Sequence, residues 1–197
     1  YASVLPAPTP CAEQVADDHF SSSLSAIQNG TRLPSSKSWA GIFDTLRDVN
    51  YFLEKNVNCD EATREKYNGV AYFFRAMIYF EMVRQFGDMP YYDKVLGSTD
   101  TKELTKPRDP RVYVMMKVLE DCDRAYERLP KDWGSDSQYR LSKDAALALK
   151  SRAALFEGTF RKYHAGTEYL PVDEQVFDGV TVSSEWFLRQ AADAAAL

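Results

Sequence analysis

The spacing of apolar residues along the chain predicts a series of helices. From position 39 onward, apolar residues recur at intervals of three and four, which places them on one helical face. The first stripe consists of Trp39, Ile42, Phe43, Leu46, Val49 and Leu53. The opposite face carries mostly charged residues, so the pattern predicts an amphipathic helix here: Asp44, Arg47, Asp48 and Glu54.

A second helix is predicted over residues 60–86, and we expect it to be central and buried. Its apolar residues cover most of its circumference: Val70, Phe73, Phe74, Met77, Ile78, Phe80, Val83 and Phe86. Asp60 is a suitable N-cap, because its carboxylate can accept a free amide of the first turn. Gly87 can adopt the left-handed conformation that ends a helix, and Pro90 prevents the helix from resuming.

Three further helices are predicted after a long connection at residues 91–107. They occupy residues 110–129, a segment after Ser142 and a segment after Ser183. Each start carries a capping signal: Asp109 followed by Pro110, Ser142, and Ser183 with Ser184. No stretch alternates between apolar and polar residues for long, so the predicted fold class is all-α.

The second and fourth predicted helices share a short repeat. The pattern Ala-x-x-x-Arg-Ala-x-x-aromatic begins at Ala71 and again at Ala148, with small residues where two helices must approach closely. This arrangement predicts helical hairpins of the tetratricopeptide-like (TPR-like) kind, in which neither hairpin buries its apolar face alone. Arg75 and Arg152 lie in these apolar helices, so we expect each to form a structural ion pair at the repeat interface.

The domain organisation predicted from these patterns is a single helical domain over residues 1–197. Residues 1–37 are rich in proline, serine and alanine and are expected to be irregular. Residues 38–163 carry the TPR-like helices, and residues 183–197 form the start of a further helix. We expect the chain to be a fragment of a longer protein, because it lacks an initial methionine and stops within a helical pattern.

Composition and motifs narrow the possible functions. The net charge of −5 leaves no basic excess for a phosphate backbone, so nucleic acid is not an expected partner. His19 and His164 are the two histidines, and neither belongs to a metalloprotease or catalytic pattern. We therefore predict no catalytic residue, no metal site and no cofactor. The acidic group Glu120, Asp121 and Asp123 is expected to form a solvated helix face.

Aromatic side chains raise the possibility of glycan binding, because sugars stack on flat aromatic faces. Five are candidates by position: Trp39, Tyr91, Tyr92, Trp133 and Tyr139. Trp133 and Tyr139 lie in a polar loop and are the most exposed of these by position. Core packing or a capping role is the more common function of such residues, and it is favoured for both.

Several consecutive segments resemble one known family. The stretch Tyr72–Pro90 ends in Arg-Gln-Phe-Gly-Asp-Met-Pro and is similar to the SusD/RagB signature of a buried helix followed by a Gly-Asp-x-Pro turn. The segments Ser38–Lys55, Arg108–Pro130 and Leu141–Gly158 are similar to other helices of that family and occur in the same order. The resemblance covers roughly residues 38–163.

This resemblance implies a function without catalysis. Members are TPR-like surface lipoproteins of the Gram-negative outer membrane that capture glycans and deliver them to a TonB-dependent, SusC-like transporter. The lipid anchor would lie outside this sequence. Within the family, peptide or glycopeptide cargo is an alternative; a TPR-like protein–protein scaffold and an all-α glycosidase are alternatives from other classes.

The resemblance also implies a location for ligand contacts. In relatives, the segment before the tryptophan-containing helix contributes to the ligand face, which corresponds here to about residues 17–39. Asn29 and Arg32 are candidates to hydrogen-bond sugar hydroxyls, and Trp39 is a candidate to stack on a sugar ring.

Overall fold

The computed structural model describes residues 29–31, 33 and 40–197. The chain divides into two compact units between Leu46 and Arg47. Helix α2 (Ala40–Lys55) crosses this division, and the other described helices and strands belong to the second unit. Within the described residues, no helix has the length and apolar character that crossing a bilayer requires.

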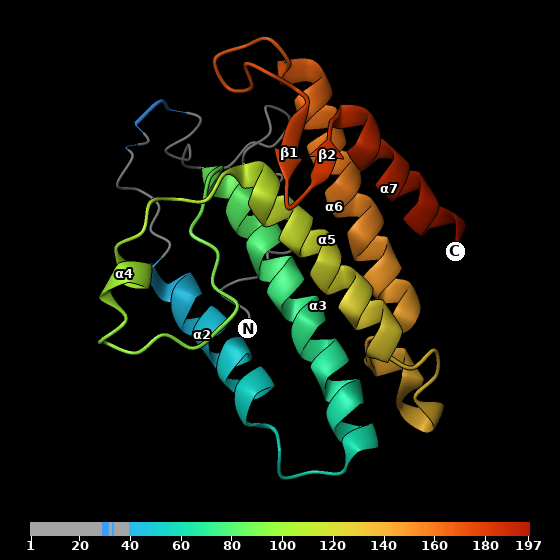
Figure 1. The fold of residues 1–197 in the computed structure, drawn as a ribbon. Helices are drawn as coiled ribbons and strands as arrows, with labels where there is room; N and C mark the ends of the chain where they lie inside the picture. Colours follow the sequence, from blue (N-terminus) through green and yellow to red (C-terminus); the bar gives the residue numbers. More distant parts are fainter. Residues whose placement is uncertain (1–28, 32, 34–39) are drawn as a thin grey trace. The chain divides into compact units, whose positions relative to one another are not determined.

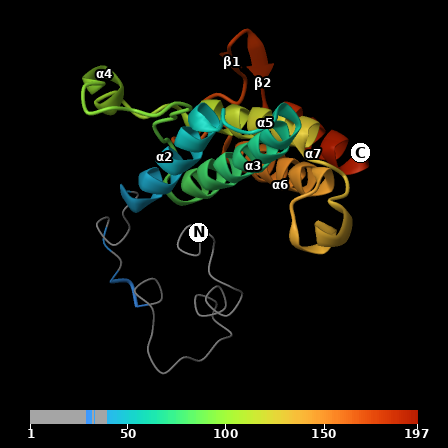
Figure 2. The same cartoon turned by 90° about the horizontal axis from the view of Figure 1, so that it is seen from below.

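Long helices arranged as two antiparallel hairpins dominate the second unit (Figure 1). Helix α3 (Glu61–Phe86) packs against α5 (Arg111–Arg128), and α6 (Lys143–His164) packs against α7 (Ser184–Ala196). Helix α5 also packs against α6, whereas α3 and α6 meet only over a short stretch. Because α5 packs against both α3 and α6, it joins the two hairpins; Figure 2 shows the same helices from below. The prediction of an all-α, TPR-like fold is confirmed.

Helices α3, α6 and α7 begin at the positions that their capping residues indicated. Asp60 Oδ1 accepts a hydrogen bond from Thr63 N at 2.9 Å, at the start of α3. Ser142 and Ser183 cap α6 and α7 in the same way. Gly87 follows α3 with a φ of +74°, a conformation that strains other residues. Local sequence therefore accounts for these helix ends.

The predicted capping role of Asp109 at the start of α5 is wrong. The residue before the helix is Pro110, and the amide of Arg111 donates instead to Asp88 Oδ1 at 2.8 Å. An antiparallel bridge between Met89 and Asp109 brings Asp88 to this helix end. The cap thus comes from the segment after α3, which no local pattern around α5 could indicate.

Short elements complete the second unit. They are α4 (Thr101–Leu104), the 3₁₀ helix η2 (Gly134–Tyr139), and an antiparallel hairpin of β1 (Gln175–Phe177) and β2 (Val180–Val182). This hairpin was not predicted. Its turn residues, Asp178 and Gly179, have φ values of +48° and +78°, and an Asp-Gly pair at positive φ is typical of a tight hairpin turn. The signal was therefore present in the sequence.

A buried ion pair lies at the interface of α3 and α5. Arg75 is 2% exposed, and its Nε and Nη2 donate to the two carboxylate oxygens of Asp121 at 2.7 and 2.8 Å. Arg75 Nη1 also donates to Asn50 Oδ1 and to the carbonyl oxygen of Asp93. We call Asn50, Arg75, Asp121 and this carbonyl the polar clamp, because they join α2, α3, α5 and the connection after α3.

The structure confirms the predicted ion pair of Arg75, whereas the predictions for Asp121 and Arg152 are wrong. Arg75 forms the expected structural ion pair. Asp121 was expected on a solvated face, but it is fully buried because it faces α3 as the partner of Arg75. Arg152 was expected to form a similar pair, but it is exposed and forms no ion pair with a described residue. It lies on the side of α6 that faces Phe80 and Arg84 of α3, where solvent hydrates its charge.

A second polar network joins α6 to the start of α7. Asp173 Oδ1 accepts from Arg161 Nε at 3.1 Å, and the amide of Ser184 donates to both Asp173 oxygens at 3.0 Å. Burial alone would raise the pKa of Asp173, but the hydrogen bonds from Ser184 and the charge of Arg161 together lower it below its usual 3.8. The folded state therefore favours the carboxylate form.

The lowered pKa predicts an acid-dependent loss of stability. Because the pKa of Asp173 is below its unfolded value of 3.8, its contribution is present above that pH and is lost as the pH falls through the folded pKa. We expect Asp173→Asn to lower the free energy of unfolding near neutral pH and to make the loss below pH 3.8 less steep. Urea titrations between about pH 7 and pH 3 measure this. Asp178→Asn, at an exposed carboxylate, is the control, and equal pH slopes in both variants would contradict the prediction.

Candidate functional site

An aromatic cluster lies on the surface where the first half of α3 meets the α5–α6 connection. It consists of Tyr67, Trp133 and Arg140. The ring centroids of Tyr67 and Trp133 are 6.0 Å apart, with 58° between the ring planes. The Arg140 guanidinium carbon lies 5.0 Å from the Trp133 ring centroid, and Arg140 Nη1 donates to the Tyr67 hydroxyl oxygen at 3.1 Å. Tyr139, the neighbour of Arg140 in the chain, is 85% exposed.

Hydrogen bonds between side chains and the backbone hold the α5–α6 connection in this conformation. The indole Nε1 of Trp133 donates to the carbonyl oxygen of Leu141 at 2.7 Å, which joins the two ends of the connection. Asp132 Oδ1 accepts from the amide of Gly134 at 2.7 Å, and Gly134 has a φ of +72°. Such a turn favours aspartate followed by glycine. The tryptophan ring is therefore positioned before any ligand arrives, which lowers the entropic cost of binding.

The cluster has the chemistry of a sugar-binding surface. Aromatic rings offer flat apolar faces for the C–H side of a pyranose, and a guanidinium donates hydrogen bonds to hydroxyl oxygens. Tyr67 is 41% exposed and Trp133 is half-buried, so both rings are accessible. Hydrogen bonds of the indole nitrogen and of the Tyr67 hydroxyl hold them in place. No group of acidic, histidine or cysteine side chains in the described residues is arranged to hold a metal ion.

The other two candidate tyrosines within the described residues have structural roles. Tyr91 is 7% exposed and its ring packs 4.8 Å from that of Tyr79; burial raises its pKa. The Tyr92 hydroxyl donates to the carbonyl oxygen of Glu103 at 2.9 Å, and the Tyr92 amide donates to the Tyr79 hydroxyl at 2.6 Å. These contacts position the connection after α3. Tyr91 is too buried to stack on a ligand, and Lys106 Nζ lies over the half-buried Tyr92 ring, 4.9 Å from its centroid.

The candidates that the family resemblance implied are only partly described. Asn29 is exposed, and its Oδ1 accepts from the amide and hydroxyl of Thr31 at 3.0 and 2.5 Å. Arg32 and Trp39 lie outside the described residues. Their proposed ligand contacts therefore stay predictions.

Tyr67 and Arg140 were not predicted as members of a site. Tyr67 precedes the apolar stripe of α3, and Arg140 ends a polar loop, so neither stands out locally. Their contact joins residues 73 positions apart. Only the packing of the α5–α6 connection against α3 brings them together.

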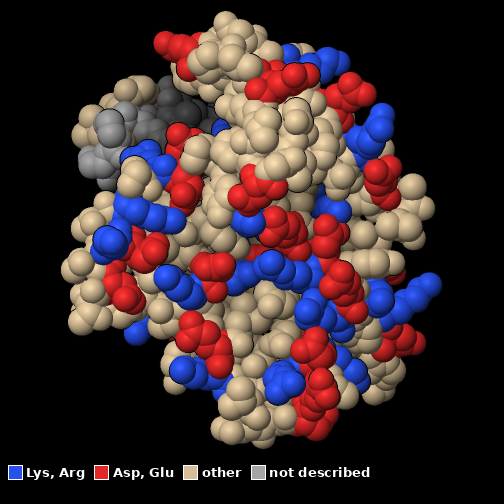
Figure 3. All heavy atoms as spheres, in the orientation of Figure 1, with Lys and Arg blue, Asp and Glu red and all other residues tan. Residues whose placement is uncertain are grey.

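The face formed largely by α5 has balanced charges. Figure 3 shows Lys and Arg interleaved with Asp and Glu over this face. Several of these cations pair with carboxylates: Lys117 with Glu120 at 3.0 Å, Lys150 with Asp123 at 2.7 Å, and Arg128 with Glu65 at 3.0 Å. These pairs leave little excess charge there, so electrostatic attraction does not single this face out as a ligand site.

Comparison with known proteins points to one family. A SusD-like family model, described as "Starch-binding associating with outer membrane", matches residues 9–155. SusD-like protein P2 of Formosa agariphila is 30% identical over 126 residues, which cover 62% of this chain and 24% of that protein. The chain therefore spans about a quarter of the length of this curated relative.

Solved structures show the same likeness. A SusD-like protein from Bacteroides fragilis is 35% identical, with a TM-score of 0.58 over 62% of this chain and 24% of its own. A laminarin-binding SusD-like protein is 20% identical, with a TM-score of 0.62 over 79% of this chain and 36% of its own. At that identity, the second likeness shows a shared fold alone.

Proposed function

The chain belongs to the SusD-like family, and on this premise we propose that it serves in glycan capture without catalysis at the bacterial outer membrane. The family model carries a starch-binding description, and one solved relative is a laminarin-binding protein. Because the chain spans only a quarter of its curated relative, the ligand and partners of the whole protein are part of the proposal.

The observation that carries the proposal is the aromatic cluster. Tyr67 and Trp133 present rings held by intramolecular contacts, and Arg140 adds hydrogen-bond donors beside them. This combination binds a neutral sugar by stacking and hydrogen bonding, and it requires no reactive group. Asn29, Arg32 and Trp39 are proposed as a second set of ligand contacts, on the family resemblance alone.

Delivery is the second half of the proposal. A captured glycan would pass to a SusC-like, TonB-dependent transporter in the outer membrane, with this protein held at the cell surface by a lipid anchor outside this sequence. The description of the family as associating with the outer membrane supports this location. Co-purification of the transporter with the native protein from solubilised outer membranes tests the partnership directly.

Native affinity electrophoresis through gels that contain different neutral polysaccharides tests capture. We expect retardation by at least one glycan without release of product. Trp133→Ala is expected to weaken binding about tenfold, because one stacking ring contributes about 1–1.5 kcal/mol. Tyr67→Leu, which keeps an apolar side chain but removes the ring, is expected to act in the same direction.

The matched control is Tyr163→Ala, at a tyrosine that is 76% exposed on α6 and outside the cluster. Circular dichroism confirms that each variant is folded. Retardation of the wild type that neither Trp133→Ala nor Tyr67→Leu reduces would place the glycan site elsewhere. No retardation by any glycan of a broad panel would contradict polysaccharide capture and favour peptide cargo.

A further inference from the structure

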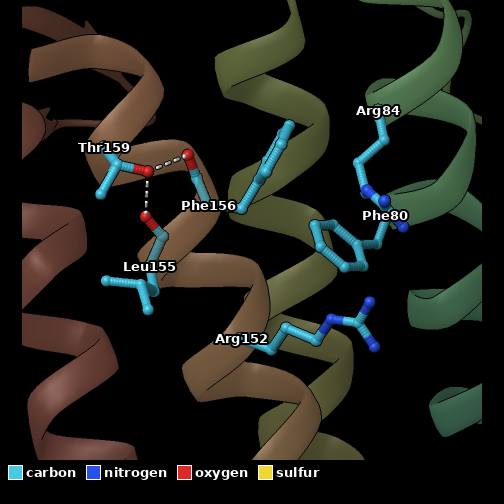
Figure 4. A pocket seen from close by; sticks show the side chains of 6 residues that line it. All are labelled: Phe80, Arg84, Arg152, Leu155, Phe156 and Thr159. Atoms are coloured by element: carbon cyan, nitrogen blue, oxygen red, sulfur yellow. Dashed lines mark hydrogen bonds between the residues drawn. The ribbon is translucent and has the colours of Figure 1, made fainter. Parts of the chain in front are cut away.

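A groove lies between α3 and α6 at the short stretch where these helices meet. Its volume is about 370 Å³, and Figure 4 shows the side chains that line it: Phe80, Arg84, Arg152, Leu155, Phe156 and Thr159. The rings of Phe80 and Phe156 meet edge to face, with centroids 5.6 Å apart, and form its apolar floor. The volume lies within the range of known small-ligand sites, about 300–1,000 Å³.

The groove carries an excess positive charge. Arg84 is neutralised by Glu81, whose two carboxylate oxygens accept from Arg84 Nη1 at 2.7 and 2.8 Å. Arg152 lies on the opposite wall and extends across the groove toward Phe80 (Figure 4). It forms no ion pair with any residue in the described part of the chain. Of the two guanidinium groups that line the groove, Glu81 therefore neutralises only that of Arg84, and the charge of Arg152 is unbalanced.

The neighbouring cation does not contribute to this excess. Arg111 lies over Phe156 with its guanidinium carbon 5.7 Å from the ring centroid, but its Nη2 donates to the fully buried Glu157 at 2.7 Å. The paired cations of the α5 face are balanced in the same way. Arg152 therefore differs from these arginines and lysines in having its charge available to a ligand.

Sugar-binding chemistry is also present beside this charge. Thr159 Oγ1 donates to the carbonyl oxygen of Leu155 at 2.8 Å, which leaves the hydroxyl oxygen able to accept from a ligand hydroxyl. Phe80 is buried beneath the groove, so the half-buried Phe156 and the exposed Leu155 supply the apolar contact, and the guanidinium of Arg152 matches the geometry of a carboxylate. A ligand that uses all three features has an apolar ring face, hydroxyl groups and one negative charge.

We propose that the groove between α3 and α6 binds the carboxylate-bearing unit of an acidic glycan, such as a uronic acid, with Arg152 as the carboxylate ligand. The choice of a sugar rests on the proposed glycan-binding function, whereas the acidic group follows from the unbalanced guanidinium. This site is separate from the aromatic cluster, which contains no residue of the groove.

Isothermal titration calorimetry with a uronic acid oligosaccharide and its carboxyl-reduced, neutral counterpart tests the proposal on the full chain. We expect the acidic oligosaccharide to bind more tightly and Arg152→Gln to weaken it about tenfold, the scale of one charge-assisted hydrogen-bonded contact. Arg152→Lys, which keeps the charge, is expected to lose less. Arg189→Gln, at an exposed arginine of α7, removes the same charge elsewhere and is the control.

The outcomes separate this proposal from the proposed function. Equal binding of the acidic and neutral oligosaccharides, unaffected by Arg152→Gln, would overturn the acidic-glycan site while glycan capture stands. Equal weakening by Arg152→Gln and Arg189→Gln would show a general charge effect and would also overturn it. If Trp133→Ala weakened binding of the acidic oligosaccharide and Arg152→Gln did not, that ligand would be assigned to the aromatic cluster. Absence of binding to either oligosaccharide and to every neutral glycan would overturn both proposals.

Discussion

Replacing Asp121 by alanine is expected to lower the free energy of unfolding by about 3–5 kcal/mol, because it leaves a buried guanidinium without its counter-charge. Arg75 is 2% exposed and Asp121 is fully buried, so water cannot replace the lost carboxylate without opening the interface between α3 and α5. The same change also removes a partner of Arg124, whose Nη1 donates to Asp121 at 2.9 Å. Urea titration followed by circular dichroism measures the loss.

Two further variants identify the cause. Asp123→Ala removes a half-exposed carboxylate two positions along the same helix, and we expect it to cost about 1 kcal/mol or less. The double variant Arg75→Met/Asp121→Leu removes both charges, and we expect a much smaller loss than Asp121→Ala alone, because no unpaired charge stays buried. If Asp121→Ala cost no more than Asp123→Ala, the polar clamp would not stabilise the fold.

Enlarging Gly158 is expected to separate α6 from α7. A Cβ atom at this position would lie 2.9 Å from the Cγ and Cδ2 atoms of Leu188 and 3.1 Å from its backbone nitrogen. These distances are too short for carbon contacts, so the helices or Leu188 must shift. We expect Gly158→Val to cost about 3 kcal/mol and Gly158→Ala about 1–2 kcal/mol, a graded loss typical of overpacking. Thermal or urea unfolding measures both.

The expected loss of stability depends on the contact between the added Cβ and Leu188, and two variants test this cause. Gly97→Ala places a Cβ no closer than 3.7 Å to its neighbours, an ordinary contact, and we expect little change. Leu188→Ala removes the side chain that a larger residue at position 158 would meet. The double variant Gly158→Val/Leu188→Ala should therefore lose less than the sum of the single losses. Strict additivity would show that Gly158 is not limited by Leu188.

Much of the fold could be predicted because helix signals are local. Asp60, Ser142 and Ser183 accept amides within three residues of themselves, and the apolar stripes need only the helical repeat. The β1–β2 hairpin was missed although its Asp-Gly turn was visible, because its three-residue strands are too short to show alternation. The cap at Arg111 was mispredicted because its acceptor, Asp88, comes from the segment after another helix, α3.

The candidate site was only partly predictable. Trp133 and Tyr139 could be named as loop aromatics from the sequence, but their neighbours could not. Tyr67 joins Trp133 and Arg140 only through the packing of a distant connection against α3. Tyr91 and Tyr92 were also candidates by position, but the connection after α3 directs them into contacts with Tyr79.

By itself, the sequence determined the helical class, most helix ends and the family resemblance, because periodicity, caps and ordered motifs act over a few residues. Only the tertiary structure decided how each charge is used. The repeat places Arg75 and Arg152 at matching sequence positions, but Arg75 faces Asp121 on α5, whereas Arg152 faces a groove. Whether an arginine becomes a buried structural ion or an accessible ligand group depends on which distant helix covers it, because burial sets the cost of leaving its charge unpaired.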